Sequence, residues 1–366
     1  MPPMTALTLQ PVACPLCLHA DCRPLFSGTD VRCRLPGRFD VVQCQHCGHR
    51  YLSPQPSAEC LAACYPTGYA PHQSSPESAP SESHHSGTLA ANRRPWFLRW
   101  LPLECVPGLR QLYYWLTDDR TQPIPRPAAT PLQPALSALE LGCAAGSWLL
   151  KLQALGWSVC GVELCAGPAD AARKAGLNVV TGTLESARLP AQSFDLVAAW
   201  MVLEHTPNPL ETLNEIRDVL KPGGQLLFSV PNASSLEARL FGSSWYSLDL
   251  PRHLQHFDPQ TILRILRDTG YEQIRIDHHR TLIGAWGSLG VLLSRVFPGS
   301  RLATWLQRYP EQPRLILQLL SAPVAIMLAW CRQGPGLTVS ARRPATTQVC
   351  SPLSAAASGS EGTVGV

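Results

Sequence analysis

The sequence predicts a doubly wound α/β domain that follows a small cysteine-rich module. Strand-like and helix-like segments alternate through residues 135–232, which is typical of a parallel sheet covered by helices. Before them, two C-x-x-C pairs lie within the first 60 residues, where large apolar side chains are few. The chain has 366 residues, 45% of them hydrophobic, so it is long enough for one such core with appendages.

The two C-x-x-C pairs predict a structural zinc site in a ribbon-like module. Each pair places two thiolates on one turn, and two turns supply the four ligands of a closed tetrahedral site. No N-terminal segment has the basic start and apolar run of an export signal, so the 14 cysteines favour metal over disulfides. A redox dithiol is the alternative. The predicted Zn²⁺ ligands are Cys14, Cys17, Cys44 and Cys47.

Composition predicts the boundaries of the other segments. After a zinc module at residues 1–65, the Pro-, Ser- and His-rich residues 66–94 predict a flexible linker. Aromatic and leucine side chains then recur at helical spacing, so residues 95–134 predict a helical N-terminal extension of the main domain. The main domain itself is expected at residues 135–345. The small, polar residues 346–366 predict a disordered tail.

A glycine-containing turn between two predicted strands indicates a nucleoside-binding crevice. A buried strand ends at Leu141, and the chain turns at Gly142 and Gly146 into a helix. Glu163 ends the next strand, where a carboxylate can accept hydrogen bonds from both ribose hydroxyls. A dinucleotide site is the alternative. Against it, Glu140 would repel a pyrophosphate, and the turn lacks the third glycine of G-x-G-x-x-G.

The turn and the motifs after it resemble the class I S-adenosylmethionine-dependent methyltransferases over about residues 135–280. The motifs E-L-G-C-x-x-G, F-D-L-V, L-E-H and L-K-P-G-G occur in the order and spacing of that family. The resemblance implies a seven-stranded sheet with helices on both faces and S-adenosylmethionine as cofactor. The residues it implies near the cofactor are Glu140, Gly142, Cys143 and Gly146 at the methionine end, Glu163 at the ribose, Thr183 and Leu184 beside the adenine, and Trp200 and Met201 after the fourth strand.

Two positions depart from the family pattern. Ala144 stands where glycine is commonest, which narrows the turn but is compatible with binding. Thr183 stands where many members have an acidic residue that contacts the adenine amine. This second departure is expected to weaken that contact or to shift it to the backbone.

Three histidines are candidate catalytic bases for the methyl acceptor. His205 lies in the L-E-H motif, and His253 and His256 lie in P-R-H-L-Q-H-F, within an acceptor lid predicted at about residues 233–335. Local packing or capping is the alternative role for each. Arg252 could hold an anionic group of the acceptor. The L-E-H motif is similar to that of the ubiquinone-pathway O-methyltransferases, but Met201 replaces their second acidic residue, so no catalytic metal is expected there.

The wider resemblance is to a bacterial subgroup with N-terminal C-x-x-C pairs, associated with methylation of sugars, surface polysaccharides and small metabolites. It implies a small-molecule acceptor such as a sugar, nucleotide sugar or polysaccharide precursor. A quinone-type O-methyltransferase and a ribosomal-RNA methyltransferase with a zinc ribbon are the alternatives. Nucleic acid is disfavoured, because residues 1–60 carry 5 arginines against 4 acidic residues and no basic-aromatic stripe.

Two apolar runs near the C-terminus leave a membrane contact open. Residues 283–296 and 315–330 are predicted to form helices that pack as a lid, and the alternative is a monotopic surface contact through residues 283–330. Residues 251–345 carry 12 arginines against 5 acidic residues, which suits an anionic partner. We expect a cytoplasmic location, peripheral to the inner membrane if this contact forms. The sequence indicates no oligomeric state, and residues 336–343 predict the last strand.

Overall fold

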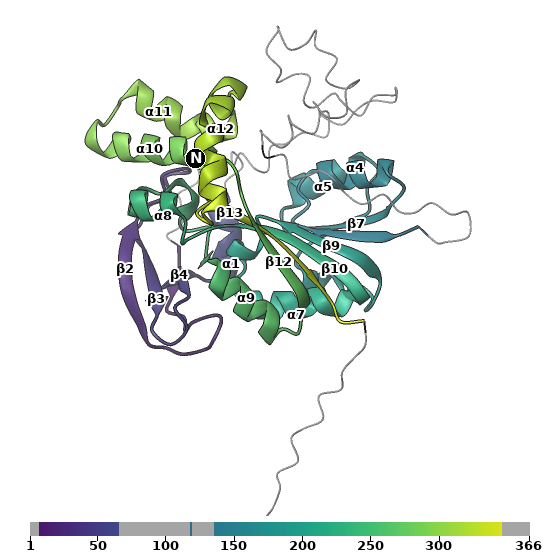
Figure 1. Ribbon diagram of the computed structural model, residues 1–366. Helices are drawn as coiled ribbons and strands as arrows, with labels where there is room; N and C mark the ends of the chain where they lie inside the picture. Colours follow the sequence, from purple (N-terminus) through teal and green to yellow (C-terminus); the bar gives the residue numbers. More distant parts are fainter. Residues whose placement is uncertain (1–6, 66–117, 119–134, 346–366) are drawn as a thin grey trace, which may run out of the picture.

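A computed structural model describes residues 7–65, 118 and 135–345 (Figure 1). The linker predicted at residues 66–94 and the tail predicted at residues 346–366 lie outside the described residues. So does the helical extension predicted at residues 95–134, apart from Asp118.

A seven-stranded sheet forms the centre of the main domain, in the order β12-β13-β10-β9-β6-β7-β8. The five strands from β10 to β8 run parallel, and β13 is antiparallel to both of its neighbours. The predicted doubly wound α/β fold with seven strands is therefore confirmed. The strands are β6 (Ser137–Leu141), β7 (Ser158–Glu163), β8 (Val179–Thr181), β9 (Phe194–Trp200), β10 (Leu220–Pro231), β12 (Glu272–His278) and β13 (Gly336–Arg342).

Helices cover both faces of this sheet (Figure 1). Leu149 and Ala169 belong to a buried apolar cluster on one side, and Leu213 and Ile262 belong to a larger cluster on the other. The central strands are buried on both faces, as expected for parallel strands between helical layers. The helices are α4 (Ser147–Ala154), α5 (Ala166–Lys174), α6 (Leu184–Ala187), α7 (Pro209–Val219) and α9 (Pro259–Asp268), with the short η5 (Leu203–His205) after β9.

The N-terminal module forms a four-stranded sheet in the order β11-β4-β3-β2. Its edge strand β11 belongs to the main domain, where Gln255 and His256 pair with Tyr51 and Arg50 of β4. A two-stranded ladder joins β1 to β5 beside it. The elements are β1 (Leu9–Gln10), β2 (Cys22–Gly28), β3 (Phe39–Cys44), β4 (Arg50–Leu52), β5 (Gln55–Pro56), α1 (Ala58–Leu61), η1 (Ala62–Cys64) and β11 (Gln255–His256).

The module shares its apolar core with the main domain. Tyr51 is fully buried in the same cluster as Leu203 and Phe257. Phe39 and Leu52 are buried in another cluster, with Trp245 and Leu254 of the lid. Burial of these side chains therefore depends on both parts of the chain being folded.

The lid contains a group of helices beside the module (Figure 1). Both apolar runs predicted as helices coincide with α10 and α12. Gly287 of α10 allows a close approach, since a Cβ there would lie 2.7 Å from the Tyr246 ring. The elements are α8 (Leu236–Phe241), η6 (Gly242–Ser244), η7 (Tyr246–Leu248), α10 (Ile283–Val296), α11 (Arg301–Arg308), η8 (Tyr309–Glu311) and α12 (Leu315–Trp330).

Within the described ranges, no single helix is long and apolar enough to cross a membrane. Residues 301–311 and 315–330 meet the criteria of length and composition only as a pair, which is bent by 79°.

Candidate functional site

The four predicted zinc ligands converge at one end of the module. The sulfur atoms of Cys14, Cys17, Cys44 and Cys47 lie within 4.8 Å of one another, and Sγ of Cys14 is 3.5 Å from Sγ of Cys47. Four thiolates around zinc at about 2.3 Å would be separated by about 3.8 Å, whereas a disulfide requires about 2.05 Å. The donor set and its spacing therefore fit a tetrahedral zinc ion.

Both C-x-x-C turns have the same backbone arrangement. The N–H of Leu18 donates to the carbonyl of Cys14 (2.8 Å), and the N–H of Gly48 donates to the carbonyl of Cys44 (3.0 Å). Leu18 and Gly48 both adopt positive φ, 61° and 76°. Glycine, which stands in the second turn, reaches this conformation without steric cost. In the first turn a leucine adopts it at a cost of about 1–2 kcal/mol.

The predicted cofactor turn lies between β6 and α4. Gly142, Ala144 and Gly146 all have positive φ, at 69°, 47° and 79°. A Cβ on Gly142 would lie 2.6 Å from Cγ2 of Val202, so the chain after β9 packs directly on this turn. The turn therefore forms with alanine at position 144. That Ala144 is also compatible with cofactor binding stays a prediction.

Two buried carboxyl groups face the turn from neighbouring strands. One oxygen of Glu163 accepts from the N–H of Ala144 and the other from the N–H of Cys165, both at 2.8 Å. Glu140 is 5% exposed, and its Oε2 has no partner among the described residues. Burial, with the charge of Glu163 added, raises the pKa of Glu140 well above its ordinary value. These carboxyl groups suit the ribose and the cationic methionine end of S-adenosylmethionine.

The other residues implied near the cofactor lie on neighbouring loops of this edge. Thr183 caps α6, where its hydroxyl accepts from the N–H of Ser186 (3.2 Å), and Leu184 is buried. Cys143 is buried in the turn. Trp200 ends β9 with its ring 5.7 Å from that of Trp148, and Met201 after it is 41% exposed.

His205 and His253 lie side by side, with the carboxyl group of Glu204 close to both. Their ring centroids are 4.6 Å apart, and Nε2 of His253 is 4.0 Å from Oε1 of the buried Glu204. Both oxygens of Glu204 lack a hydrogen-bond partner among the described residues, and burial raises the pKa of Glu204 to about 8. Potential ligand atoms of these three residues lie within 4.8 Å of one another, so they could also hold a divalent cation.

Backbone carbonyl groups define the tautomers of both histidines. Nδ1 of His205 is 3.0 Å from the carbonyl of Arg252, and Nδ1 of His253 is 2.8 Å from that of Ser247. Since a carbonyl only accepts, each Nδ1 carries the proton and each Nε2 keeps a lone pair. Tyr65 also contacts Nδ1 of His205, at 2.9 Å. Burial lowers the pKa of His205 to about 4, so the ring is neutral near pH 7.

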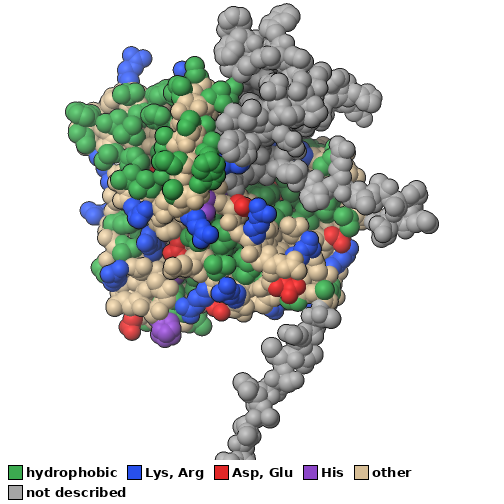
Figure 2. Space-filling view, in the orientation of Figure 1, with side chains coloured by type: hydrophobic (Ala, Val, Ile, Leu, Met, Phe, Trp, Pro, Cys, Tyr) green, Lys and Arg blue, Asp and Glu red, His purple; other side chains and the backbone are tan. Residues whose placement is uncertain are grey.

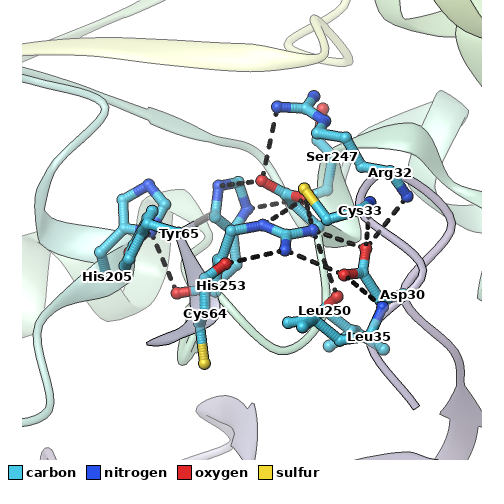
Figure 3. A network of polar contacts seen from close by, with 12 residues as sticks. Asp30, Arg32, Cys33, Leu35, Cys64, Tyr65, His205, Ser247, Leu250 and His253 are labelled. Carbon is cyan, nitrogen blue, oxygen red and sulfur yellow. Dashed lines mark hydrogen bonds and ion pairs between the residues drawn. The ribbon is translucent and has the colours of Figure 1, made fainter. Parts of the chain in front are cut away.

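Arg252 belongs to a buried ion network, and Figure 3 shows Asp30 and Arg32 of this network near His253. The guanidinium of Arg252 donates to Asp30 of the module and to Asp249 of the lid, each at 2.7 Å, and all three side chains are at most 2% exposed. Asp249 also pairs with Arg32 at 3.5 Å. Burial opposes ionisation of Asp249, but Arg32 and Arg252 hold its pKa well below the ordinary value. The prediction that Arg252 holds an anionic acceptor is therefore wrong, because two carboxylates already neutralise it.

His256 is not part of the Glu204, His205 and His253 cluster. It is 5% exposed in β11, paired with Arg50 of the module, and its Nε2 has no partner among the described residues. Burial and the nearby His49 and Arg50 lower its pKa to about 3. Its surroundings indicate a role in joining the module to the main domain.

Tyr65 contacts His205, Asp249 lies 3.9 Å from His253, and Asp30 binds Arg252, but none of these three residues is predicted from the sequence. Asp249 lies four residues before His253, so its place near the P-R-H motif was a usable signal. Asp30 and Tyr65 are 222 and 140 residues from their partners, and no motif marks either of them.

Comparisons with known proteins find similarity to methyltransferases. Residues 109–276 match a family model described as a methyltransferase domain. A malonyl-[acyl-carrier protein] O-methyltransferase of Serratia marcescens is 30% identical over 133 residues, which are 36% of this chain and 51% of the relative. A ubiquinone biosynthesis O-methyltransferase of Azoarcus sp. (strain BH72) is 30% identical over 153 residues, which are 38% of this chain and 65% of the relative.

The chain thus spans between half and two thirds of the length of these curated relatives. The N-terminal module lies outside residues 109–276, the range matched by the family model.

Proposed function

We propose that the chain transfers the methyl group of S-adenosylmethionine to a small-molecule acceptor, as the match of residues 109–276 to a methyltransferase domain supports. The observation that supports this proposal best is the cofactor turn, where every second residue from Gly142 to Gly146 has positive φ and the carboxyl groups of Glu140 and Glu163 lie at the same edge of the sheet. S-adenosylmethionine, when bound, supplies an activated methyl group. The chain's task is then to orient the acceptor and to exclude water.

His205 is the proposed base for an acceptor hydroxyl or amine. It follows β9, and Val202 of the same segment packs on the cofactor turn. Its Nδ1 is held by Arg252 and Tyr65, which leaves the Nε2 lone pair to accept a proton. His253 packs against the His205 ring and positions it. The buried carboxyl group of Glu204 lies next to His253.

Zinc is proposed as a structural ion of the N-terminal module, because four thiols converge at the spacing that zinc requires. Elemental analysis of the purified chain by mass spectrometry tests this. We expect one zinc per chain, lost in Cys44→Ser and retained in Cys331→Ser, whose exposed thiol lies in the lid. Metal-free wild type with four reactive thiols would refute the site.

The acceptor class is proposed as a sugar, nucleotide sugar, polysaccharide precursor or related metabolite. This rests on the resemblance to the bacterial subgroup, while the matched ubiquinone relative favours a quinone as second candidate. Incubation with methyl-labelled S-adenosylmethionine and a fractionated bacterial extract separates them. Label in water-soluble small molecules or glycans supports the first, and label in the quinone fraction supports the second. Ribonuclease-sensitive label would overturn both.

A further inference from the structure

The outer face of the lid helices carries most of the exposed large apolar side chains. Eleven of the fifteen such side chains among the described residues lie between positions 292 and 330. Leu320 is 72% exposed and Trp330 is 77% exposed. Figure 2 shows hydrophobic side chains gathered where α10, α11 and α12 lie. We call these side chains of residues 292–330 the lid face. Contiguous apolar exposure of this kind marks an interaction site.

Arginines accompany the lid face. Residues 295–332 contain five arginines, and Glu311 is the single acidic residue of that range. Three of them, Arg301, Arg308 and Arg314, line one hollow together with Trp305 and Tyr309. None of the three has a salt bridge to a residue that the structure describes, and the guanidinium of Arg314 lies 5.4 Å above the Trp305 ring. This hollow suits a phosphate group.

We propose that the lid face docks on an anionic phospholipid bilayer, with the hollow of Arg301, Arg308 and Arg314 receiving a lipid phosphate. Apolar side chains would enter the interface while arginines and the amphipathic Trp305 and Trp330 lie at headgroup level. The helix α12 has 16 residues, about 24 Å, so it lies along the surface more readily than it crosses about 30 Å of hydrocarbon. The docked enzyme then meets acceptors at the membrane surface.

Charge argues against two other occupants of the lid face, namely a second copy of the chain and residues 95–134 of the same chain. A second copy of the chain in a two-fold dimer would bring two arginine clusters together. Residues 95–134 of the same chain contain 4 arginines against 3 acidic residues, so their net charge is positive like that of the lid face. An anionic bilayer supplies both an apolar layer and the countercharge.

Vesicle co-sedimentation of the full chain tests the proposal. We expect the wild type to pellet with phosphatidylcholine vesicles that contain phosphatidylglycerol, and much less with phosphatidylcholine alone. The double variant Leu320→Glu/Trp330→Glu should bind at least tenfold more weakly. Its control, Gln153→Glu/Ala154→Glu at the exposed end of α4, adds the same charge elsewhere and should bind like wild type.

The arginine hollow is tested separately. Arg301→Ala/Arg308→Ala/Arg314→Ala should lose at least tenfold in binding to phosphatidylglycerol vesicles, since each basic residue near such a surface contributes about 1 kcal/mol, or about fivefold. The control Arg188→Ala/Arg267→Ala/Arg275→Ala removes the same charge from other exposed positions. Circular dichroism confirms that each variant folds.

Several outcomes would overturn the proposal. One is that the wild type and both lid-face variants pellet equally with vesicles. A second is that the wild type binds no vesicles but forms a dimer, which the substitutions Leu320→Glu/Trp330→Glu dissociate. Another is a loss of thermal stability in that variant with no effect on vesicles, which would indicate cover by the chain itself. Binding of inorganic phosphate without vesicles would mark a soluble-phosphate site instead. All measurements are made without S-adenosylmethionine, so they do not depend on the proposed methyl transfer.

Discussion

Arg252 of the P-R-H-L-Q-H-F motif has a structural role. Its guanidinium is fully buried between Asp30 and Asp249, so it joins the N-terminal module to the lid and cannot meet a substrate. The carbonyl of the same residue orients His205. One arginine therefore connects the packing of the module with the candidate base.

Replacing Arg252 should destabilise the whole chain. In Arg252→Met, Asp30 and Asp249 would remain buried without their cation, which costs about 3–5 kcal/mol. Urea unfolding measures this, with the exposed Arg267→Met as control. A loss below about 1 kcal/mol would show that the network does not join the two parts.

The neutral form of His205 should be required for methyl transfer, because only an unprotonated ring can take a proton from the acceptor. His205→Gln keeps a similar shape but cannot take a proton, so the methylation rate should fall by about 10²–10⁴-fold with S-adenosylmethionine affinity unchanged. Because burial lowers the pKa of His205 to about 4, the wild-type rate should be constant from pH 6 to 8 and fall only as the pH approaches 4.

The profile is recorded with a chelator and with added Mg²⁺, since Glu204, His205 and His253 could hold a cation. A rate that falls with a midpoint near pH 6.5, or a variant with near wild-type rate, would contradict the role of His205 as base.

Side chains near in sequence to a motif were predictable, and distant ones were not. The four cysteines and Glu163 could be named because spacing and strand ends determine their place. Asp30 reaches Arg252, and Tyr65 reaches His205, only through packing of the module against the main domain. No local pattern encodes that packing.

At the scale of elements, helices whose sequence has a continuous apolar run or an N-cap residue begin and end where these local signals indicate. The helices α10 and α12 coincide with the two predicted apolar runs, and α9 begins after Asp258, whose side chain accepts from the N–H of Thr261. The strand β11 has two residues and forms only because β4 pairs with it, so no periodicity could reveal it. Short elements of this kind depend on tertiary contacts.

Glu237 should give the contact between α8 and α10 a pH dependence. It is 5% exposed, its Oε1 accepts from Ser288 Oγ (3.1 Å), and burial raises its pKa to about 7. Between about pH 4.5 and 7 the folded state holds a proton that the unfolded chain has released. The unfolding free energy should therefore fall as pH rises, by about 3 kcal/mol over the range.

Glu237→Gln should remove this component, because the amide does not titrate. Urea unfolding at several pH values measures it, with the exposed Glu211→Gln as control. Equal pH slopes for wild type and Glu237→Gln would show that Glu237 is ionised in the folded chain.

At the scale of the molecule, the N-terminal module and the main domain pack against each other extensively. They share strand β11 and two apolar clusters, and the Arg252 network joins them. The sequence predicts the two parts but not their union, because shared burial arises from residues far apart in the chain. This arrangement makes the module a component of the candidate active site.

Removal of zinc should therefore destabilise the main domain. Structural zinc contributes about 10–16 kcal/mol in small zinc modules, and its loss should expose the shared clusters. Scanning calorimetry of the untreated chain should show one transition, which moves to lower temperature after chelation. Two transitions, of which only one responds to the chelator, would show that the module unfolds independently.

The central claim is that the turn after β6 binds S-adenosylmethionine with the help of Glu163. Isothermal titration calorimetry tests it most directly, because no acceptor is needed. We predict one site per chain in the wild type and in Glu185→Ala, an exposed control, and at least tenfold weaker binding in Glu163→Ala. No binding to the wild type, or unchanged binding to Glu163→Ala, would contradict this claim.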